Sequence, residues 1–148
     1  MQIRRITAAD RKDFLRLAKE FYHSEAVLHP IPAKYHQRAF EEMIRSDVYA
    51  DGFMIEWNGA TVGYGMTAKT FSHEAGGLTV WIEELYLVPE YRGRGIGHAF
   101  FAFIEEYYGD ALCRLRLETE PGNTRAEALY KSIGYEELGY RPFVKEMV

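Results

Sequence analysis

The feature that most constrains this chain is a short run of glycine and arginine between a predicted strand and a predicted helix. It consists of Arg92, Gly93, Arg94, Gly95, Ile96 and Gly97. The apolar residues 81–88 are typical of a strand, and the periodicity of residues 98–108 is typical of a helix. Glycines let backbone N–H groups approach a ligand, and a helix N-terminus offers unpaired N–H donors. Because arginine adds forked donors that suit phosphate, the run predicts a site for a phosphate-bearing ligand.

The composition narrows the class of protein. The chain has 148 residues, of which 47% are hydrophobic, so we expect one folded domain over residues 1–148. A net charge of −4 does not favour nucleic acid as a partner, because nucleic-acid binding usually needs a basic surface. The sequence shows no signal-peptide pattern and no apolar run near the roughly 18 residues that span a bilayer. We therefore expect a cytoplasmic protein that does not bind membranes.

Hydrophobic periodicity and turn residues predict the order of the elements. The predicted strands cover residues 2–6, 52–57, 61–71, 78–88, 111–117, 133–138 and 140–147. Asn58-Gly59 between two of these strands predicts a hairpin, and Thr7 with Asp10 three residues on predicts a capping box at the first helix. The predicted helices cover residues 8–22, 33–46, 98–108 and 124–132. Antiparallel strands followed by a β-α-β crossover predict an α/β (α+β) fold. It has a mixed, mostly antiparallel sheet of about seven strands, with helices on both faces.

Several interpretations of the glycine-rich loop compete. A dinucleotide-binding fingerprint needs G-x-G-x-x-G, but counting from Gly93 places His98 at the third position, and counting from Gly95 places Phe100 there. The P-loop pattern G-x-x-x-x-G-K-[ST] does not occur in the sequence. A tight turn without a ligand is the remaining alternative. The two arginines beside the helix N-terminus favour an anion site over that alternative.

Two motifs in the chain resemble those of the GCN5-related N-acetyltransferases. Residues 81–97 closely resemble the acetyl-CoA-binding motif of that family, Q/R-x-x-G-x-G/A after the fourth strand. A second motif, N-x-x-A-x-x-L-Y-x-x-x-G-F, is matched by Asn123, Ala126, Leu129, Tyr130, Gly134 and Tyr135, with Tyr135 in the usual Phe place. Because the order of elements also matches, the resemblance spans the chain. It implies the fold of that family, with a splay between the fourth and fifth strands, and acetyl-CoA as cosubstrate.

The resemblance also implies roles for individual residues. Backbone N–H groups of residues 92–97 would hold the pyrophosphate of CoA, and the fourth strand would pair with the pantetheine. An N–H group of Leu87 or Val88 would polarise the thioester carbonyl. Tyr130 matches the tyrosine that faces the CoA sulfur, where it would donate a proton or hydrogen bond to the departing thiolate. Asn123 either bonds the pantetheine or caps the following helix.

Two adjacent glutamates are the candidates for the catalytic base. Glu83 and Glu84 lie in an otherwise apolar strand, and strict alternation would place them on opposite faces. Charged residues are rarely buried unless paired, so at least one should line a cleft. The resemblance implies a glutamate base here, acting directly or through water. Glu83 is favoured, and Glu84 would face solvent or pair with an arginine.

The acceptor side of the predicted site is acidic. Glu118 and Glu120 follow the predicted strand 111–117, and together with Glu83 they favour a cationic amine as the acceptor. The alternative is a solvated acidic turn. No histidine spacing typical of a metal site is present, so we expect no metal. Cys113 opens an apolar strand and is expected to be buried and inert.

The sequence therefore predicts an acetyl-CoA-dependent N-acetyltransferase in which a small-molecule or peptide amine attacks the thioester directly in a ternary complex. The alternative on the same fold is a non-catalytic acyl-CoA-binding or sensor module, which needs neither Tyr130 nor a carboxylate on the fourth strand. A third interpretation is a protein that binds another nucleotide through the loop. The tyrosine-rich segment 134–147 makes a homodimer one possibility.

Overall fold

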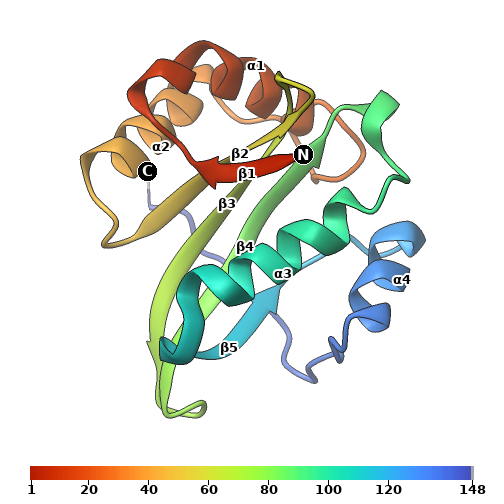
Figure 1. Ribbon diagram of the computed structural model, residues 1–148. Coiled ribbons are helices and arrows are strands. Elements are labelled where there is room, and N and C mark those ends of the chain that lie inside the picture. Colours follow the sequence, from red (N-terminus) through yellow and green to blue (C-terminus); the bar gives the residue numbers. More distant parts are fainter. Residues whose placement is uncertain (148) are drawn as a thin grey trace.

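The computed structural model describes residues 1–147, in which five strands form one sheet in the order β1-β2-β3-β4-β5 (Figure 1). The strands are β1 (Gln2–Arg5), β2 (Ala50–Trp57), β3 (Ala60–Ser72), β4 (Gly77–Leu87) and β5 (Leu112–Leu117). The α-helices are α1 (Arg11–Tyr22), α2 (Ala33–Arg45), α3 (Ile96–Tyr108) and α4 (Thr124–Ser132). Neighbouring strands are antiparallel, except that β4 and β5 are parallel. Among residues 1–147, no helix combines the length and the apolar character that a membrane-spanning helix requires.

Helices cover both faces of the sheet, as predicted (Figure 1). Helices α1 and α2 pack on one face, in an apolar cluster that includes Phe14, Phe40 and Tyr64. Helices α3 and α4 pack on the other face, in a cluster that includes Phe100 and the half-buried Leu129. The predicted hairpin between β2 and β3 is confirmed. Asn58 and Gly59 have φ values of +50° and +79°, the left-handed conformation that a tight two-residue turn requires.

The pairing between β4 and β5 stops before β4 ends. Residues Leu78 to Ile82 of β4 pair with Leu112 to Leu117 of β5. Strand β4 then continues to Leu87 while still paired with β3 on its other side. The last residues of β4 therefore have a partner on one edge only, which is the splay that the family resemblance implies.

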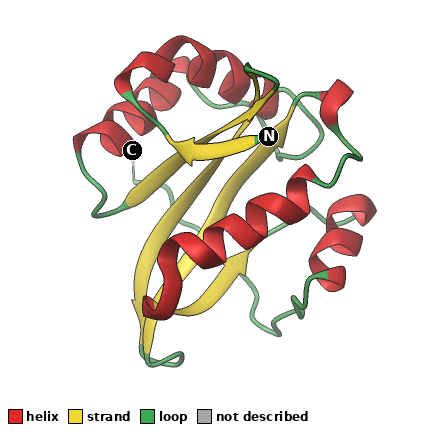
Figure 2. Ribbon diagram, viewed as in Figure 1, coloured by secondary structure: helices red, strands yellow, loops and turns green. Residues whose placement is uncertain are grey.

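The prediction of about seven strands is wrong by two in the described part of the chain, because residues 133–147 form no strand (Figure 2). Gly134, at φ +92°, and Tyr135 instead donate backbone hydrogen bonds to the last turn of α4, to Lys131 and Tyr130. Pro142 has no N–H group to give to a sheet. The segment leaves β5 as an edge strand, and Cys113 on it is exposed rather than buried as expected.

An ion-pair network joins the start of the chain to the sheet. Arg4 in β1 donates two hydrogen bonds of 2.8 Å to Asp10, just before α1, and two, of 2.6 and 2.9 Å, to Glu56 in β2. The backbone N–H of Thr7 also donates to Asp10, at 2.7 Å, so the predicted capping interaction is present. The hydrogen bonds from Arg4 are the main reason that the pKa of Asp10 is lowered to about 2.

We predict that Asp10→Asn lowers the free energy of unfolding by on the order of 1–3 kcal/mol at neutral pH, because Arg4 loses one of its two charged partners. A carboxylate with a lowered pKa stabilises the fold above its unfolded-state pKa, and this contribution disappears as pH falls through the folded-state value. The difference between wild type and variant should therefore shrink between pH about 4 and about 2 in urea titrations. Asp13→Asn, an exposed carboxylate on α1, is the control; an equal effect in both variants would contradict the prediction.

Candidate active site

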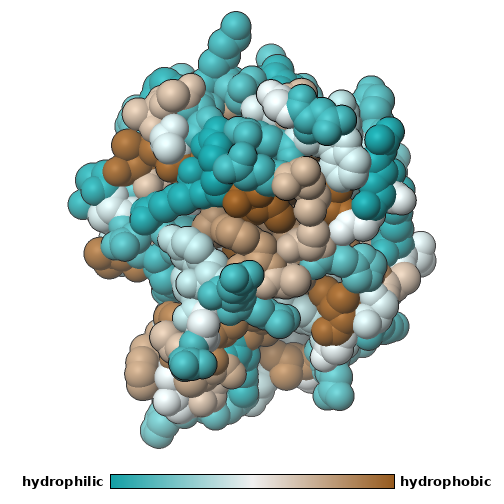
Figure 3. Space-filling view, in the orientation of Figure 1, coloured by the Kyte–Doolittle hydropathy of each residue, from teal (hydrophilic) through white to brown (hydrophobic). Residues whose placement is uncertain are grey.

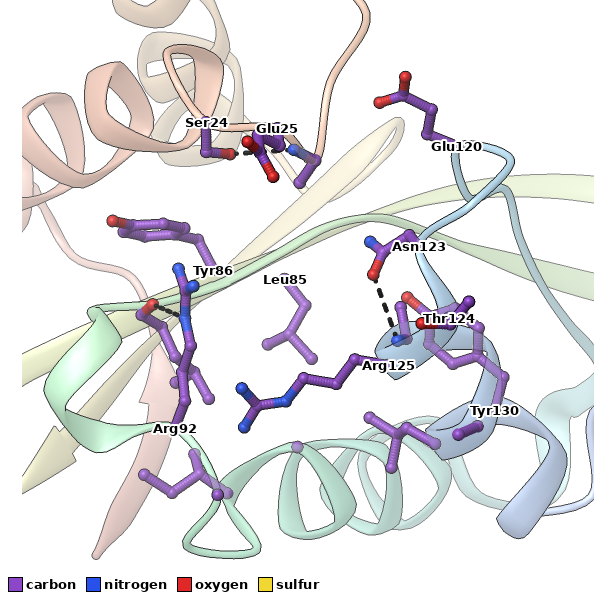
Figure 4. A pocket seen from close by; sticks show the side chains of 18 of the residues that line it. Ser24, Glu25, Leu85, Tyr86, Arg92, Glu120, Asn123, Thr124, Arg125 and Tyr130 are labelled. Atoms are coloured by element: carbon purple, nitrogen blue, oxygen red, sulfur yellow. Dashed lines mark hydrogen bonds between the residues drawn. The ribbon is translucent and has the colours of Figure 1, made fainter.

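A cavity of about 1280 Å³ lies beside the part of β4 that has lost its β5 partner (Figure 4). Its walls come from four segments: the loop between α1 and α2, the end of β4, the glycine-rich loop with the start of α3, and the start of α4. The sequence-predicted site residues in the lining are Leu87, Arg92, Gly93, Gly95, Ile96, Gly97, Asn123 and Tyr130. The fold thus brings both sequence motifs to one cavity.

The glycine-rich loop has the backbone shape that the anion-site prediction needs. Gly93 and Gly95 have φ values of +76° and +78°, a conformation that strongly favours glycine. Helix α3 begins directly afterwards, so its first N–H groups, which have no partner within the helix, lie at the cavity wall. A Cβ on Gly97 would come within 3.0 Å of Leu129, so this glycine also permits close packing of α3 on α4. The cavity therefore offers backbone donors to a negatively charged group.

The two arginines of the loop are placed differently. Arg92 lines the cavity, donates from Nε to the Leu87 carbonyl at 3.0 Å, and lies 5.6 Å from the Tyr86 ring. Arg94 instead stacks against the ring of Tyr91 at 5.1 Å and donates to the carbonyl of Glu90 at 3.2 Å. The Arg94 side chain is not part of the cavity lining, so we assign it to the turn.

A different arginine joins Arg92 at the cavity. Arg125, on the first turn of α4, extends across the cavity toward the glycine-rich loop (Figure 4). Its guanidinium lies 3.6 Å from the position that a Cβ on Gly93 would take. Arg125 was not predicted as a site residue, because an arginine between two motif positions on a helix looks like a solvent-facing residue. Two arginines from separate elements make this end of the cavity cationic.

The end of β4 exposes backbone groups toward the cavity. The N–H of Val88 donates to the Val62 carbonyl of β3 at 2.9 Å, so it is already used. In an antiparallel pair, successive residues direct their backbone groups to alternate sides, so the N–H groups of Leu85 and Leu87 point away from β3. No β5 residue pairs with this part of β4. Between the two sequence candidates for a thioester donor, this geometry favours Leu87.

A bulge in β4 corrects the expected placement of the two glutamates. Met66 pairs with Glu84 and Thr67 pairs with Ile82, so Glu83 is an extra residue without a partner in β3. Ile82 and Leu85 both belong to the apolar cluster under α3. The two residues between them therefore face the opposite side, toward α1, and strict alternation fails here.

The two glutamates differ in their surroundings. Glu84 is half-buried and accepts hydrogen bonds from the hydroxyls of Tyr22, at 2.6 Å, and Tyr64, at 2.5 Å. It thus pairs with two tyrosines, neither facing solvent nor pairing with an arginine. Glu83 reaches solvent, yet partial burial, followed by the charges of Glu84 and Glu118, raises its pKa.

Neither glutamate lines the cavity itself, but Leu85 and Tyr86, which follow on the strand, do. An accessible carboxylate with a raised pKa, next to the cavity, has the properties of a general base. Glu120 lines the cavity, and Glu118 lies close enough to influence Glu83. The side of the cavity near Glu120 is therefore acidic, whereas the end near Arg92 is basic.

Tyr130 and Asn123 lie on the α4 side of the cavity. The Tyr130 ring packs 5.8 Å from Phe101 and 6.0 Å from Tyr135, and burial raises the pKa of its hydroxyl. The hydroxyl thus keeps its proton at neutral pH and can serve as a donor. The side-chain oxygen of Asn123 accepts from the Ala126 N–H at 3.3 Å, so Asn123 caps α4 (Figure 4).

Comparison with known proteins relates this geometry to a family. Residues 12–135 match the Acetyltransferase (GNAT) family. The chain is 38% identical to the thialysine N-epsilon-acetyltransferase of Bos taurus over 52% of its own length and only 45% of the bovine protein. It is 27% identical to the Mus musculus thialysine N-epsilon-acetyltransferase, over 93% of its own length and 85% of the mouse protein. AAC(6')-Iy, solved in complex with the bisubstrate analogue CoA-S-monomethyl-acetylneamine, has a similar fold, with a TM-score of 0.82 at 18% identity over 99% of this chain and 98% of that one.

Proposed function

The chain belongs to the acetyltransferase (GNAT) family, and from this premise we propose that it transfers an acetyl group from acetyl-CoA to a primary amine. The observation that carries the proposal is the cavity at the free edge of β4, where two arginines, helix N–H groups, a protonated tyrosine and a nearby carboxylate come together. Each of these groups can either bind the phosphates of CoA or assist transfer of the acetyl group from its thioester.

The cofactor side of the proposal rests on the basic end of the cavity. The pyrophosphate of CoA is expected to bind the N–H groups of residues 93–97 together with Arg92 and Arg125. The pantetheine, which carries amide groups, would pair as an added strand with the backbone groups that Leu85 and Leu87 direct away from β3. The thioester would then lie beside Leu87 and Tyr130, with the Leu87 N–H available to its carbonyl oxygen.

The reaction we propose is a direct transfer in a ternary complex. Glu83, through a water molecule, accepts a proton from the ammonium form of the acceptor, and the free amine attacks the thioester carbonyl carbon. The new C–N bond forms as the C–S bond breaks, and the nitrogen releases its second proton to solvent. Tyr130 donates a proton or a hydrogen bond to the departing CoA thiolate, since its raised pKa keeps its hydroxyl protonated, and it recovers a donated proton from solvent. Glu84 is held by its two tyrosines and is assigned no proton transfer.

We propose a small cationic amine as the acceptor. Glu83, Glu118 and Glu120 gather negative charge on the acceptor side, which favours a cation by direct electrostatic attraction. The names of the two mammalian relatives and of the AAC(6')-Iy ligand also refer to amine-bearing acceptors. We infer the cationic acceptor from the carboxylates of this chain. The names of the relatives and of the ligand support only the class of acceptor, an amine.

An assay of CoA release from acetyl-CoA across a panel of amines tests this function. Diamines, polyamines, amino sugars and lysine analogues should be acetylated with higher kcat/KM than neutral or anionic amines of similar size. A preference for anionic acceptors would contradict the cationic assignment. CoA binding with no turnover on any amine would favour the sensor module instead of an enzyme.

We predict that Arg92→Ala and Arg125→Ala each weaken CoA binding by about ten- to hundredfold, because each removes a charged donor from the pyrophosphate. Arg94→Ala is the matched control from the same loop, and its effect should be small because its side chain stacks on Tyr91. Isothermal titration calorimetry with CoA and with pantetheine, which carries no phosphate, separates the contribution of the phosphates to the binding free energy. Equal losses in all three variants would contradict the placement of the anion site.

Tyr130→Phe should lower kcat by about a hundredfold or more while CoA affinity stays within a fewfold, since only the hydroxyl is removed. Steady-state kinetics combined with CoA titration measures both quantities on the same preparation. Tyr135→Phe, in the adjacent packed ring, is the control and should leave kcat nearly unchanged. An unchanged kcat in Tyr130→Phe would remove this hydroxyl from the mechanism.

The pH dependence of kcat/KM should identify Glu83 as the base. Because the carboxylate form is active, kcat/KM should fall as pH decreases through the pKa of Glu83, which burial raises above its ordinary value. Glu83→Gln should lower kcat by about a hundredfold or more and remove that acidic limb. Glu118→Gln should shift the limb to lower pH, because it removes a negative neighbour. A Glu83→Gln profile with the wild-type acidic limb would exclude Glu83 as the base.

A further inference from the structure

The loop between α1 and α2, residues 23–32, forms one wall of the cavity but has few buried contacts of its own. Residues 24–27 contribute to the lining. Figure 4 shows Ser24 and Glu25 across the cavity from Arg125. Seven of the ten loop residues are exposed and none is fully buried. Because a segment with few buried contacts opens easily, the position of this wall must be fixed from outside the loop.

The surface near the loop offers it little apolar support. On the face shown in Figure 3, hydrophobic residues form only small, separate groups between hydrophilic ones, so no large apolar patch there is available for a loop to pack on. Leu28, in the middle of the loop, is itself 79% exposed. A specific polar contact is therefore the better candidate for what holds the loop in place.

Both ends of the loop meet at the side chain of Tyr22. The loop begins directly after Tyr22, which is the last residue of α1. It ends where α2 begins, and His36 lies on the first turn of α2. The ring of His36 is buried, and its centroid lies 5.2 Å from that of the Tyr22 ring. One aromatic side chain therefore lies against both ends of the segment.

The hydroxyl of Tyr22 ties this junction to the sheet. It donates to Oε1 of Glu84 at 2.6 Å, while the hydroxyl of Tyr64 in β3 donates to Oε2 of the same carboxylate at 2.5 Å. Hydrogen bonds to a charged acceptor are stronger than those between neutral groups. Glu84 directly follows Glu83, the bulge residue and proposed base. The loop wall and the base are thus held to the same point of β4.

We propose that Tyr22 is a positioning residue for the amine acceptor: through its hydrogen bond to Glu84 it holds the loop 23–32 in the place where this wall of the cavity contacts the acceptor. The proposal rests on the acetyl transfer proposed above, and it concerns a residue outside the cavity lining. Without the hydroxyl, the loop occupies that place for only a fraction of the time, and the apparent affinity for the acceptor falls by that fraction. Once the acceptor has bound, the loop is in position, so the rate of transfer is kept.

Steady-state kinetics at saturating acetyl-CoA tests the proposal with two matched variants, using the amine that has the highest kcat/KM in the panel above. Tyr22→Phe and Tyr64→Phe each keep the ring and remove one hydroxyl from the same carboxylate, but only Tyr22 adjoins the loop. Tyr22→Phe should raise KM for the amine by about tenfold, as expected for one lost hydrogen bond to a charged group, while kcat stays within about twofold. Tyr64→Phe should change KM by less than about twofold.

The comparison also separates positioning from a general loss of stability. The Tyr64 side chain is fully buried and that of Tyr22 is half-buried, so Tyr64→Phe is the harsher change for the fold, as thermal melting of both variants should show. A rise in KM confined to Tyr22→Phe therefore cannot come from lost stability. An unchanged KM in Tyr22→Phe, or the same rise in both variants, would overturn the proposal.

Amide hydrogen exchange follows the loop without any turnover. The Ser24 N–H donates to the Phe21 carbonyl at 3.0 Å and the Ala26 N–H donates to the Ser24 hydroxyl at 3.3 Å, so both amides report on the folded loop. Their exchange should be about tenfold faster in Tyr22→Phe and unchanged in Tyr64→Phe. Equal exchange in wild type and Tyr22→Phe would overturn the proposal even in an active enzyme. A wild type that acetylates no amine would instead overturn the acetyl transfer, while exchange would still show whether Tyr22 holds the loop.

Discussion

The site depends on one break in the sheet: β4 loses β5 as its partner after Ile82. Up to that residue the two strands are parallel neighbours, and beyond it the backbone of β4 is paired on the β3 side only. The consequence is that Leu85 and Leu87 direct their backbone N–H groups away from β3, toward a cavity between two layers of helices. A short 3₁₀ turn, Pro89–Tyr91, is all that separates the end of β4 from the glycine-rich loop, so the anion site lies close to this strand edge.

A second irregularity in the same strand determines where the two adjacent glutamates lie. The bulge at Glu83 turns two consecutive glutamates to one side of the sheet, and the hydroxyls of Tyr22 and Tyr64 hold Glu84 there. Tyr22 is the last residue of α1, so the Glu84 contact also fixes the point at which the loop beside the cavity begins. Glu83 is left as the accessible carboxylate. Burial and its acidic neighbours raise its pKa, which suits a base that must take and release a proton.

Features that depend on a few neighbouring residues could be predicted from the sequence. Features that depend on strand register or on the packing of helices could not. The hairpin at Asn58 and the loop at residues 92–97 are specified by their own glycines, so both were placed correctly. The bulge at Glu83 arises from the register against β3, and no local signal marks it. Arg125 reaches the cavity only because α4 packs on α3. Residues 133–147 have a strand-like composition, yet they form no strand beside the open edge of β5, so composition alone did not determine strand pairing here.

The most direct measurement of the central claim, that the free edge of β4 receives the donor substrate, is amide hydrogen exchange of β4 with and without CoA. The account predicts that CoA slows exchange at Leu85 and Leu87 and at the N–H groups of residues 93–97. Exchange at Val88 should change little, because its N–H is already bonded to Val62. Protection confined to the glycine-rich loop, with Leu85 and Leu87 exchanging as in the free protein, would contradict the account.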